Sequence, residues 1–463
     1  TDTFRYPLHG GGNWMRSHSR LFVLFLFAVF ASAPGTLPAA TAEDKAALSA
    51  LDATFRARVD PDATEADRER ALALIHKVID RIVSSYIEPF DIRELANFAA
   101  SAIRPFGNGM KPADLAYAAI DTLVRRLDDP YATFDRRRMK TGGRRTGGIG
   151  IEATIVDGRL KVIAPLEGSP AQKAGIQPGD LILEIDREPI QGITLSEAMA
   201  KIRGPLGSEV LLRILRHGSR KIGLPIERTR YKVRAIRHSV LGQFAYIRIA
   251  FFGPSTEKLL RQSLAAIRTE MGGVEPQGFI VDLRDNPGGL VGQAILVADA
   301  FLESGMIVAT LGRDATGARK YDAYRGDFIK GRPIIVLQNE ATASASEILS
   351  AALKDHRRAT IMGTRSYGKG IVQTVYPFGA QGTIKFTTHK YMTAAGIPIH
   401  GVGILPHIVV NGDPRPAYGA AAAPIERCPT AGAAQDKMLG CALLFMTQGA
   451  AIEPFLKALP SDR

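Results

Sequence analysis

The chain has 463 residues, enough for roughly two to four domains that each bury their own core. Its hydrophobic content of 46% and charged content of 23% are typical of a soluble globular protein. No cluster of Cys and His has the spacing of a zinc site, so we expect neither a metal nor another cofactor. The net charge of +13 favours contact with anionic surfaces.

Residues 15–42 have the anatomy of a secretory signal peptide. A short basic region is followed by 11 apolar residues at 21–31 and by an A-x-A cleavage signal at 40–42. The apolar stretch is too short to span a membrane, and an uncleaved membrane anchor remains the alternative. We interpret residues 1–14 as an upstream extension and expect an exported protein of the periplasm.

Residues 43–140 are expected to form a helical N-terminal domain. Between residues 71 and 83, apolar side chains recur at spacings of three and four, as one face of an amphipathic helix requires. Further helices are expected at 92–102 and 112–127. Such a domain can serve as a cap or as a dimerisation domain, so a homo-oligomer is one expected assembly.

The densest basic run lies at 136–145. It contains no aromatic side chains on which bases could stack, so a nucleic-acid partner is not expected. Glycines interrupt the run, and we interpret it as a solvated linker. Peripheral contact with anionic lipid or cell-wall polymer is the expected use of its charge.

Residues 146–230 change to short apolar alternations, loops and short helices. The string SPAQKAGIQPGD at 169–180 is specific to PDZ domains, which this region resembles. Such a domain holds the carboxylate of a peptide C-terminus on backbone N–H groups and pairs the peptide with an edge strand. The resemblance assigns the carboxylate loop to Gly148, Ile149, Gly150 and Ile151, and the groove lining to Leu195, Met199 and Ile202. An intramolecular lid is the alternative role.

Residues 231–410 alternate strand-like and helical stretches, as a largely parallel α/β core requires. Buried strands are expected at 279–283 and 333–337, the first followed by a glycine turn and the second by a helix. Since functional turns gather at the carboxyl ends of parallel strands, we expect this turn and this helix to lie close together. The predicted fold class is multidomain α/β, with the helical region, the PDZ domain and this core in sequence.

Ser344 and Lys369 are the most informative pair in the core. Ser344 lies in the run ATASASE at 341–347, and Lys369 follows 25 residues later between two glycines. A buried, neutral lysine amine can accept the proton of a serine hydroxyl and leave a nucleophilic oxygen. A histidine-based hydrolase is not indicated, because no serine lies in a G-x-S-x-G turn.

Each member of the pair also has a plainer interpretation. Ser344 and Glu347 match S-x-x-E, the capping box that opens many helices. Residues 363–369 match the first seven positions of a phosphate-binding loop. The eighth position is Gly370 instead of Ser or Thr, and a strand is expected to follow where that loop needs a helix. Nucleotide binding is therefore not supported.

Together these motifs resemble the carboxyl-terminal processing peptidases, the tail-specific protease family. The agreement extends from LDDPY at 127–131, through the PDZ region, to GVGILP at 401–406. The resemblance implies a serine endopeptidase with Ser344 as nucleophile, Lys369 as general base and Gln373 as the residue that orients the lysine. For the oxyanion hole it implies the backbone N–H groups of Ala345 and of the turn at Gly288 and Gly289.

The implied substrates are proteins or peptides with a free, apolar C-terminus, and an adaptor protein is a further implied partner. The alternative is a catalytically inactive PDZ adaptor on a protease scaffold. That alternative predicts the loss of Ser344, Lys369 or Gln373, and all three are present.

Some positions depart from the family pattern. Ala395 and His407 stand where many relatives carry Ser and Asp, and for Asp355 we expect a structural role. Residues 411–463 form a C-terminal extension without a match. Its cysteines, Cys428 and Cys441, are either a disulfide or two free buried thiols.

Overall fold

The part of the chain that the computed structural model describes begins at residue 41. It comprises residues 41–136, 146–156, 158–193, 195–216, 218–230, 234–313, 318–324, 326–410, 420–432 and 436–460. The expected signal peptide up to residue 40 and most of the basic run lie outside these residues. The last two positions of the expected cleavage signal are described: Thr41 caps helix α1, which begins at Ala42.

The N-terminal region is helical, as its periodicity predicts. Its helices are α1 (Ala42–Arg56), α2 (Glu65–Ser85), α3 (Ile92–Ile103) and α4 (Pro112–Arg126). Thr41, Thr64 and Asp91 accept backbone N–H groups at the starts of the first three helices, and α4 begins with a proline. The apolar stripe of α2 is buried against its neighbours.

The core of this helical region also takes side chains from elsewhere in the chain. Phe134 of strand β1 (Thr133–Asp135) is buried in it, and so are Ile384 and Phe386 of the long strand β18 (Thr383–Thr393). The ring of Phe386 contacts Tyr86 edge-to-face at 5.9 Å between centroids. The helical region therefore shares a core with strand β18, which belongs to the region at 231–410.

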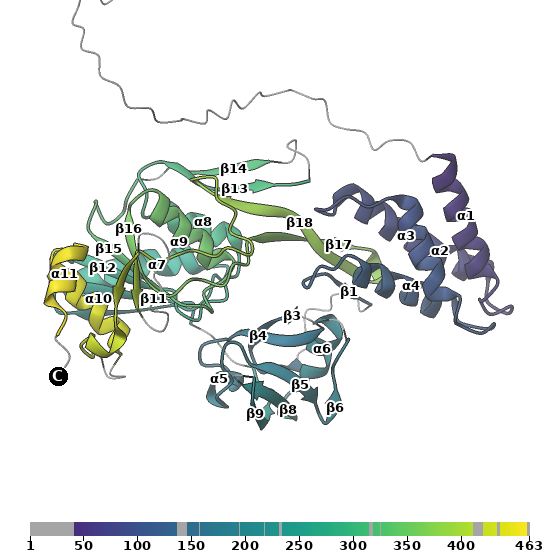
Figure 1. Ribbon diagram of the computed structural model, residues 1–463, viewed down its shortest axis with the longest axis horizontal. Helices are drawn as coiled ribbons and strands as arrows, with labels where there is room; N and C mark the ends of the chain where they lie inside the picture. Colours follow the sequence, from purple (N-terminus) through teal and green to yellow (C-terminus); the bar gives the residue numbers. More distant parts are fainter. Residues whose placement is uncertain are drawn as a thin grey trace, which may run out of the picture. The chain divides into compact units, whose positions relative to one another are not determined.

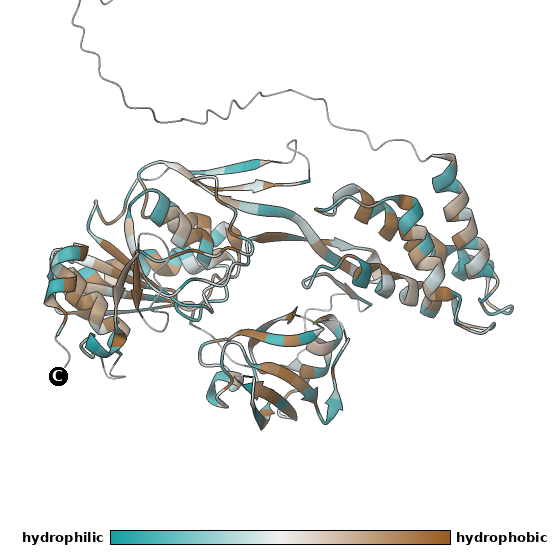
Figure 2. Ribbon diagram, in the orientation of Figure 1, coloured by the Kyte–Doolittle hydropathy of each residue, from teal (hydrophilic) through white to brown (hydrophobic). Residues whose placement is uncertain are grey.

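The middle region has the strand and helix order expected of a PDZ domain. Its antiparallel sheet has the order β3-β4-β5-β8-β9, with β6 beside β5, so β3 is an edge strand. The strands are β2 (Thr146–Gly147), β3 (Ile151–Val156), β4 (Arg159–Pro165), β5 (Leu181–Ile185), β6 (Glu188–Pro189), β7 (Gly204–Pro205), β8 (Glu209–Arg216) and β9 (Arg220–Glu227). Helices α5 (Pro170–Lys173) and α6 (Leu195–Ile202) complete the region. Brown, hydrophobic residues recur along its strands in Figure 2.

The α/β core is built on a mostly parallel sheet of order β10-β11-β12-β15-β16-β19-β20, in which only the β10 pairing is antiparallel. The strands are β10 (Ile236–Leu241), β11 (Phe244–Ile249), β12 (Gly278–Asp282), β15 (Ile334–Gln338), β16 (Ala359–Gly363), β19 (Ile408–Val410) and β20 (Ala421–Ala423). Helices α7 (Thr256–Glu270), α8 (Val291–Asp299) and α9 (Ala345–Asp355) share one hydrophobic cluster with it. The multidomain α/β fold class is thus confirmed (Figure 1).

A second sheet in this part of the chain is antiparallel and was not anticipated from the sequence. Strand β18 pairs with β1 over residues 383–385, with β17 (Ile371–Pro377) over residues 383–390, and with β13 (Gly305–Leu311) over residues 390–393. Strand β14 (Arg319–Ala323) completes this sheet. Because β17 follows Lys369 directly, the sheet determines where that lysine lies.

The C-terminal extension covers the face of the parallel sheet opposite to α7, α8 and α9. Helices α10 (Lys437–Thr447) and α11 (Ile452–Ala458) bury apolar side chains against β12 and β15. A disulfide joins Cys428 to Cys441. Among the described residues no single helix is long and apolar enough to cross a membrane, although α10 and α11, bent by 120° between them, pass that test together.

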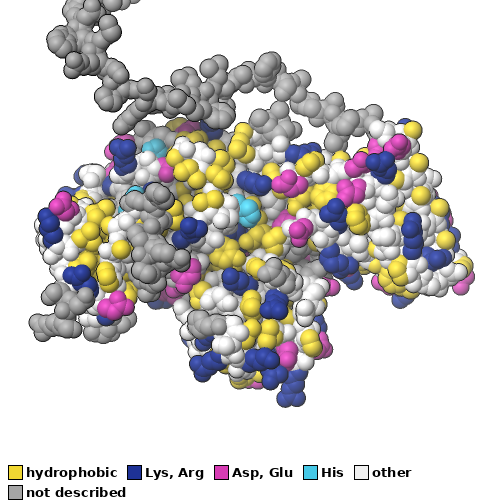
Figure 3. Space-filling view, viewed as in Figure 1, with side chains coloured by type: hydrophobic (Ala, Val, Ile, Leu, Met, Phe, Trp, Pro, Cys, Tyr) yellow, Lys and Arg dark blue, Asp and Glu magenta, His cyan; other side chains and the backbone are white. Residues whose placement is uncertain are grey.

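Surface charge is spread over the described part of the chain. On the face that Figure 3 draws, Lys and Arg side chains are scattered among Asp and Glu. The one charge of the basic run that is described, Arg136, forms an ion pair with Asp121 of α4. The rest of that run, which carries the expectation of contact with an anionic surface, lies outside the described residues.

Candidate functional site

Ser344 stands at the junction between strand β15 and helix α9. Its backbone has φ +57° and ψ −118°, a conformation that non-glycine residues rarely adopt. Between Ala341 and Leu353, Ser344 is the one residue that is not buried. The strained turn therefore presents this hydroxyl at the surface of an otherwise buried helix start.

The glycine turn lies directly against Ser344, as expected for turns at the carboxyl ends of parallel strands. A Cβ added to Gly288 would lie 2.8 Å from the Cβ of Ser344 and 2.9 Å from the backbone nitrogen of Ala345. Gly288 has φ +101° and Gly289 has φ +135°, so the backbone itself also requires glycine. The carbonyl oxygen of a substrate at Ser344 would lie between backbone N–H groups of the glycine turn and of the start of α9.

Asn286 is buried in this turn and fixes its shape. Its Oδ1 accepts the N–H of Gly288 at 2.9 Å, and its carbonyl oxygen accepts the N–H of Ala343 at 2.9 Å. Its Nδ2 donates to the carbonyl oxygen of Ile249 at 2.8 Å. Since the Gly288 N–H is already bonded, Gly289 is the better candidate donor to an oxyanion, together with Ala345.

Glu347 joins the serine to the lysine segment. Its carboxylate is fully buried and accepts the backbone N–H of Ser344 at 2.9 Å, which is one half of the expected capping box. It also accepts the Ser366 hydroxyl at 2.5 Å and the backbone N–H groups of Gly368 and Lys369 at 2.6 and 2.8 Å. One carboxylate therefore holds the backbones of Ser344 and Lys369 together.

The pKa of Glu347 reflects two opposing effects. Burial raises the pKa above its ordinary value, and the hydrogen bonds from Ser366, Gly368, Ser344 and Lys369 oppose that rise. All four groups donate hydrogen bonds to the oxygens of Glu347, and an ionised carboxylate, which only accepts, fits this arrangement.

The amine of Lys369 contacts residues of two other modules. Its Nζ donates to Oε1 of Glu152, on the PDZ edge strand β3, at 2.9 Å. It also lies 4.7 Å from the ring centroid of Tyr131, as a cation–π contact. The Lys369 side chain is only 11% exposed. Among the described residues, no hydrogen bond joins Lys369 Nζ to Ser344 Oγ.

Gln373 lies on β17, four residues after Lys369. Its Nε2 donates to the carbonyl oxygen of Tyr131 at 2.8 Å. Tyr131 in turn places its ring over the lysine amine. Gln373 is thus connected to Lys369 through Tyr131 in this structure.

Buried polar groups surround the lysine. Burial raises the pKa of the Tyr131 hydroxyl above its ordinary value, with a smaller contribution from Tyr367. A second lysine, Lys385 of β18, has a lowered pKa because it is buried and because Lys369 carries a like charge nearby.

The proposed PDZ residues divide between core and surface. The N–H of Gly148 donates to the Thr229 carbonyl oxygen at 3.2 Å. The three isoleucines of this set, Ile149, Ile151 and Ile202, are buried, with exposed fractions of 7% or less. Leu195 and Met199 of α6 are partly buried and can contact a ligand beside β3.

Asp355 and the two residues that depart from the family pattern, Ala395 and His407, lie in structural contacts. Asp355 Oδ2 accepts the N–H of Ala395 at 2.7 Å, and His407 Nδ1 accepts the N–H of Ile361 at 3.0 Å. Burial lowers the pKa of His407. Within the described ranges, no group of three His, Cys, Asp or Glu side chains could hold a metal ion.

Sequence reasoning missed several residues around the pair. Tyr131 was noticed only as the end of LDDPY, and Glu347 only as a helix cap. Glu152 gave no signal, because it is one polar residue on an alternating strand. Asn286 lay inside the predicted turn without a role of its own.

Family models match two parts of the chain. A model of peptidase family S41 matches residues 243–410, which include Ser344, Lys369 and Gln373. A PDZ-domain model matches residues 161–216.

Curated relatives are similar over a longer stretch. The carboxy-terminal-processing protease of Bartonella bacilliformis is 43% identical over 298 residues, which cover 63% of this chain and 69% of that protein. The carboxyl-terminal-processing protease of a Synechocystis strain is 35% identical over 311 residues, 64% of this chain and 71% of the relative. Carboxy-terminal processing protease CtpA of Bacillus subtilis is 34% identical, with 64% and 63% covered.

A solved structure agrees with the sequence relatives. The photosystem II D1 C-terminal processing protease superposes with a TM-score of 0.63 at 26% identity. The match covers 75% of this chain and 93% of that one.

Proposed function

Because this chain belongs to peptidase family S41, as a PDZ-containing serine endopeptidase related to the carboxy-terminal processing proteases, we propose that Ser344 and Lys369 are its catalytic dyad. Ser344 Oγ attacks the scissile carbonyl carbon while Lys369 Nζ accepts the hydroxyl proton. Lys369 then gives this proton to the leaving amine as the peptide bond breaks. Water hydrolyses the resulting ester with Lys369 again accepting a proton, and Ser344 is restored.

The N–H groups of Ala345 and Gly289 are the proposed donors to the oxyanion. Gly288 contributes the close approach to Ser344, because its own N–H is bonded to Asn286. Gln373 is proposed to hold the lysine through Tyr131.

One observation carries this proposal: the buried carboxylate of Glu347 binds the backbones of Ser344 and Lys369 at once. A structural helix cap needs only the first of these contacts. The contacts to Gly368 and Lys369 bring a segment from another part of the core to the serine. That arrangement favours a dyad over two unrelated residues.

The ion pair with Glu152 suggests a resting state of the enzyme. A neighbouring carboxylate favours the ammonium form of an amine, and an ammonium group cannot accept a proton from Ser344. Glu152 lies on β3, the edge strand with which a peptide tail would pair. We propose that binding of an apolar C-terminal tail displaces β3 enough to release Lys369, and that the enzyme meets such substrates after export.

The test uses the full-length enzyme and a quenched fluorescent peptide that ends in apolar residues. Ser344→Ala and Lys369→Ala are each expected to abolish cleavage while the melting temperature stays near that of the wild type. Ser350→Ala and Lys320→Ala are matched controls: the Ser350 hydroxyl is buried on α9 without a described partner, and Lys320 is exposed. Undiminished cleavage by either dyad variant would refute the assignment, and an inactive wild type would favour the PDZ adaptor.

A further inference from the structure

The C-terminal extension contacts the catalytic turn, although it lies beyond the part of the chain that the peptidase model matches. That match ends at residue 410. In the extension, Asp436 precedes α10 and caps it by accepting the N–H of Leu439 at 3.0 Å. Asp436 also lies between Cys428 and Cys441, so the disulfide closes the loop that carries it.

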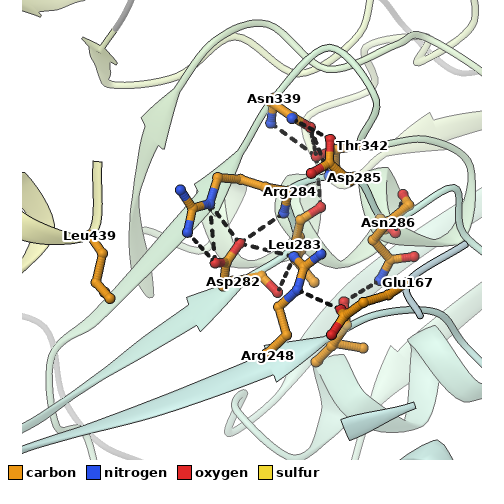
Figure 4. A network of polar contacts seen from close by, with 12 residues as sticks. Glu167, Arg248, Asp282, Leu283, Arg284, Asp285, Asn286, Asn339, Thr342 and Leu439 are labelled. Atoms are coloured by element: carbon orange, nitrogen blue, oxygen red, sulfur yellow. Dashed lines mark hydrogen bonds and ion pairs between the residues drawn. The ribbon is translucent and has the colours of Figure 1, made fainter. Parts of the chain in front are cut away.

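Asp436 meets Arg284, which follows strand β12. Nη1 and Nη2 of Arg284 donate to the two carboxylate oxygens of Asp436 at 3.1 and 2.6 Å. The same guanidinium donates to Asp282 from Nε and from Nη2. In Figure 4, Arg284 lies over Asp282, and Leu439 marks the side from which α10 approaches. A two-pronged pair of this kind fixes both the position and the plane of the guanidinium.

The pair between Arg284 and Asp436 differs from the other contacts of this arginine. Asp282 is only two residues away and moves together with Arg284. Asp436 is 152 residues away and belongs to another layer of the molecule. The Arg284 side chain is 18% exposed and that of Asp436 is 24% exposed, so solvent screens this pair only in part. Asp436 therefore connects Arg284 to a segment outside its own turn, the C-terminal extension.

Arg284 leads directly into the proposed oxyanion turn. Only three residues separate it from Gly288, and the first of them, Asp285, has φ +55°. Asn339 fixes Asp285 from the opposite side, by accepting its N–H at 2.9 Å and donating to its carboxylate at 2.8 Å. Asn286 fixes the middle of this turn and Asn339 fixes Asp285, whereas the entry of the turn, at Arg284, is held by the two carboxylates of Asp282 and Asp436.

We propose that Asp436 is a positioning residue for the oxyanion turn and acts on it through Arg284. The disulfide-closed loop holds Asp436, Asp436 holds the guanidinium, and the guanidinium fixes the entry of the turn that presents Gly289 to the substrate carbonyl. This inference rests on the proposed function, because it assumes that the turn next to Ser344 stabilises the oxyanion. It extends the catalytic assembly into a segment outside the matched peptidase region.

The decisive variant is Asp436→Asn in the full-length enzyme. Asn caps a helix as well as Asp does, so α10 keeps its start, while the charged pair with Arg284 is lost. We expect kcat for the fluorescent peptide to fall about tenfold, less than for outright loss of an oxyanion donor, with KM changed by less than about twofold. Asp91→Asn, at the cap of α3, is the matched control and should leave both constants unchanged.

Asp436→Ala separates the two roles of this side chain, because it removes the cap as well as the ion pair. We expect a lower melting temperature than for Asp436→Asn but a similar kcat. A kcat for Asp436→Asn within about twofold of wild type would overturn the inference, as would a loss confined to KM. A loss of kcat that follows the melting temperature through both variants would also overturn it.

Ser344→Ala, assayed beside these variants, identifies which statement fails. If Ser344→Ala is inactive while Asp436→Asn has full kcat, only the positioning role of Asp436 is wrong. If Ser344→Ala retains activity, the proposed dyad itself is wrong.

Discussion

The serine side and the lysine side of the candidate site are built in different ways. Around Ser344, the groups that bind the backbone come from the α/β core, chiefly Asn286 in the turn and Glu347 on α9. The backbone of Lys369 shares this support through Glu347. The amine of Lys369, by contrast, contacts Tyr131 from the end of the helical region and Glu152 from the PDZ domain.

This difference separates what is fixed from what can be regulated. The positions of the two backbones depend on buried contacts within one core, which resist displacement. The direction of the lysine amine depends on an ion pair whose carboxylate side chain is 40% exposed and belongs to another domain. A ligand of the PDZ domain can therefore act on the lysine side chain without rebuilding the site.

The largest expected effect comes from breaking the shared support. Glu347→Gln keeps the size of the side chain but replaces one accepting oxygen with an NH₂ group. This NH₂ group is a donor and cannot accept the N–H groups that face it. We expect kcat to fall by about 100-fold or more, because both dyad backbones lose their common anchor. Steady-state kinetics on the fluorescent peptide and thermal melting measure the effect.

Glu340→Gln is the control for that experiment. Its carboxylate accepts the Thr364 hydroxyl at the surface, seven residues before Glu347. Wild-type kcat in the Glu347→Gln enzyme would show that the serine and lysine segments keep their places without the buried carboxylate.

The sequence alone predicts much of the serine side. Strands at 279–283 and 333–337 were recognisable by their apolar runs, and the rule for parallel sheets then places Gly288 beside Ser344. Both residues lie within a few positions of their strand, so local pattern was sufficient. The approach of Gly288 to Ser344 confirms that expectation of proximity.

The lysine side resists prediction because its contacts are distant in the chain. Glu152 is 217 residues from Lys369, and Tyr131 is 242 residues from Gln373. Nothing in an alternating PDZ strand distinguishes a solvated glutamate from one that binds a lysine of another domain. The antiparallel sheet of β18 was missed for a related reason, since its strands join segments that read as separate domains.

A smaller effect, an increase in activity, is expected when the Lys369 amine is released from Glu152. Glu152→Gln removes the charge that holds the Lys369 amine, and a partly exposed pair of this kind contributes about 1 kcal/mol. We expect kcat/KM for a short peptide without an apolar C-terminus to rise about fivefold. Glu184→Gln, which affects a PDZ ion pair with Arg213, is the control and should change nothing. A fall in the Glu152→Gln rate would mean that Glu152 assists the lysine.

The smallest expected effect concerns stability beneath the serine side. Burial alone would raise the pKa of Asp282, but Arg248 and Arg284 outweigh it and lower the pKa from 3.8 to about 2. Because the folded-state pKa is depressed, the stabilisation is complete above about pH 4 and is lost as the pH falls toward 2. Asp282→Asn should therefore melt several degrees below the wild type at pH 6, and this gap should narrow at pH 2.5.

Asp62→Asn, in the exposed loop between α1 and α2, is the control for this experiment and should follow the wild type at both pH values. A gap between Asp282→Asn and the wild type that stays constant with pH would show that shape, and not charge, makes Asp282 important. A narrowing gap would mean that the charge pairs of Asp282 stabilise the strand end from which the glycine turn departs. The serine side would then depend on acid-sensitive charges as well as on packing, while the lysine side depends on the contact with the PDZ domain.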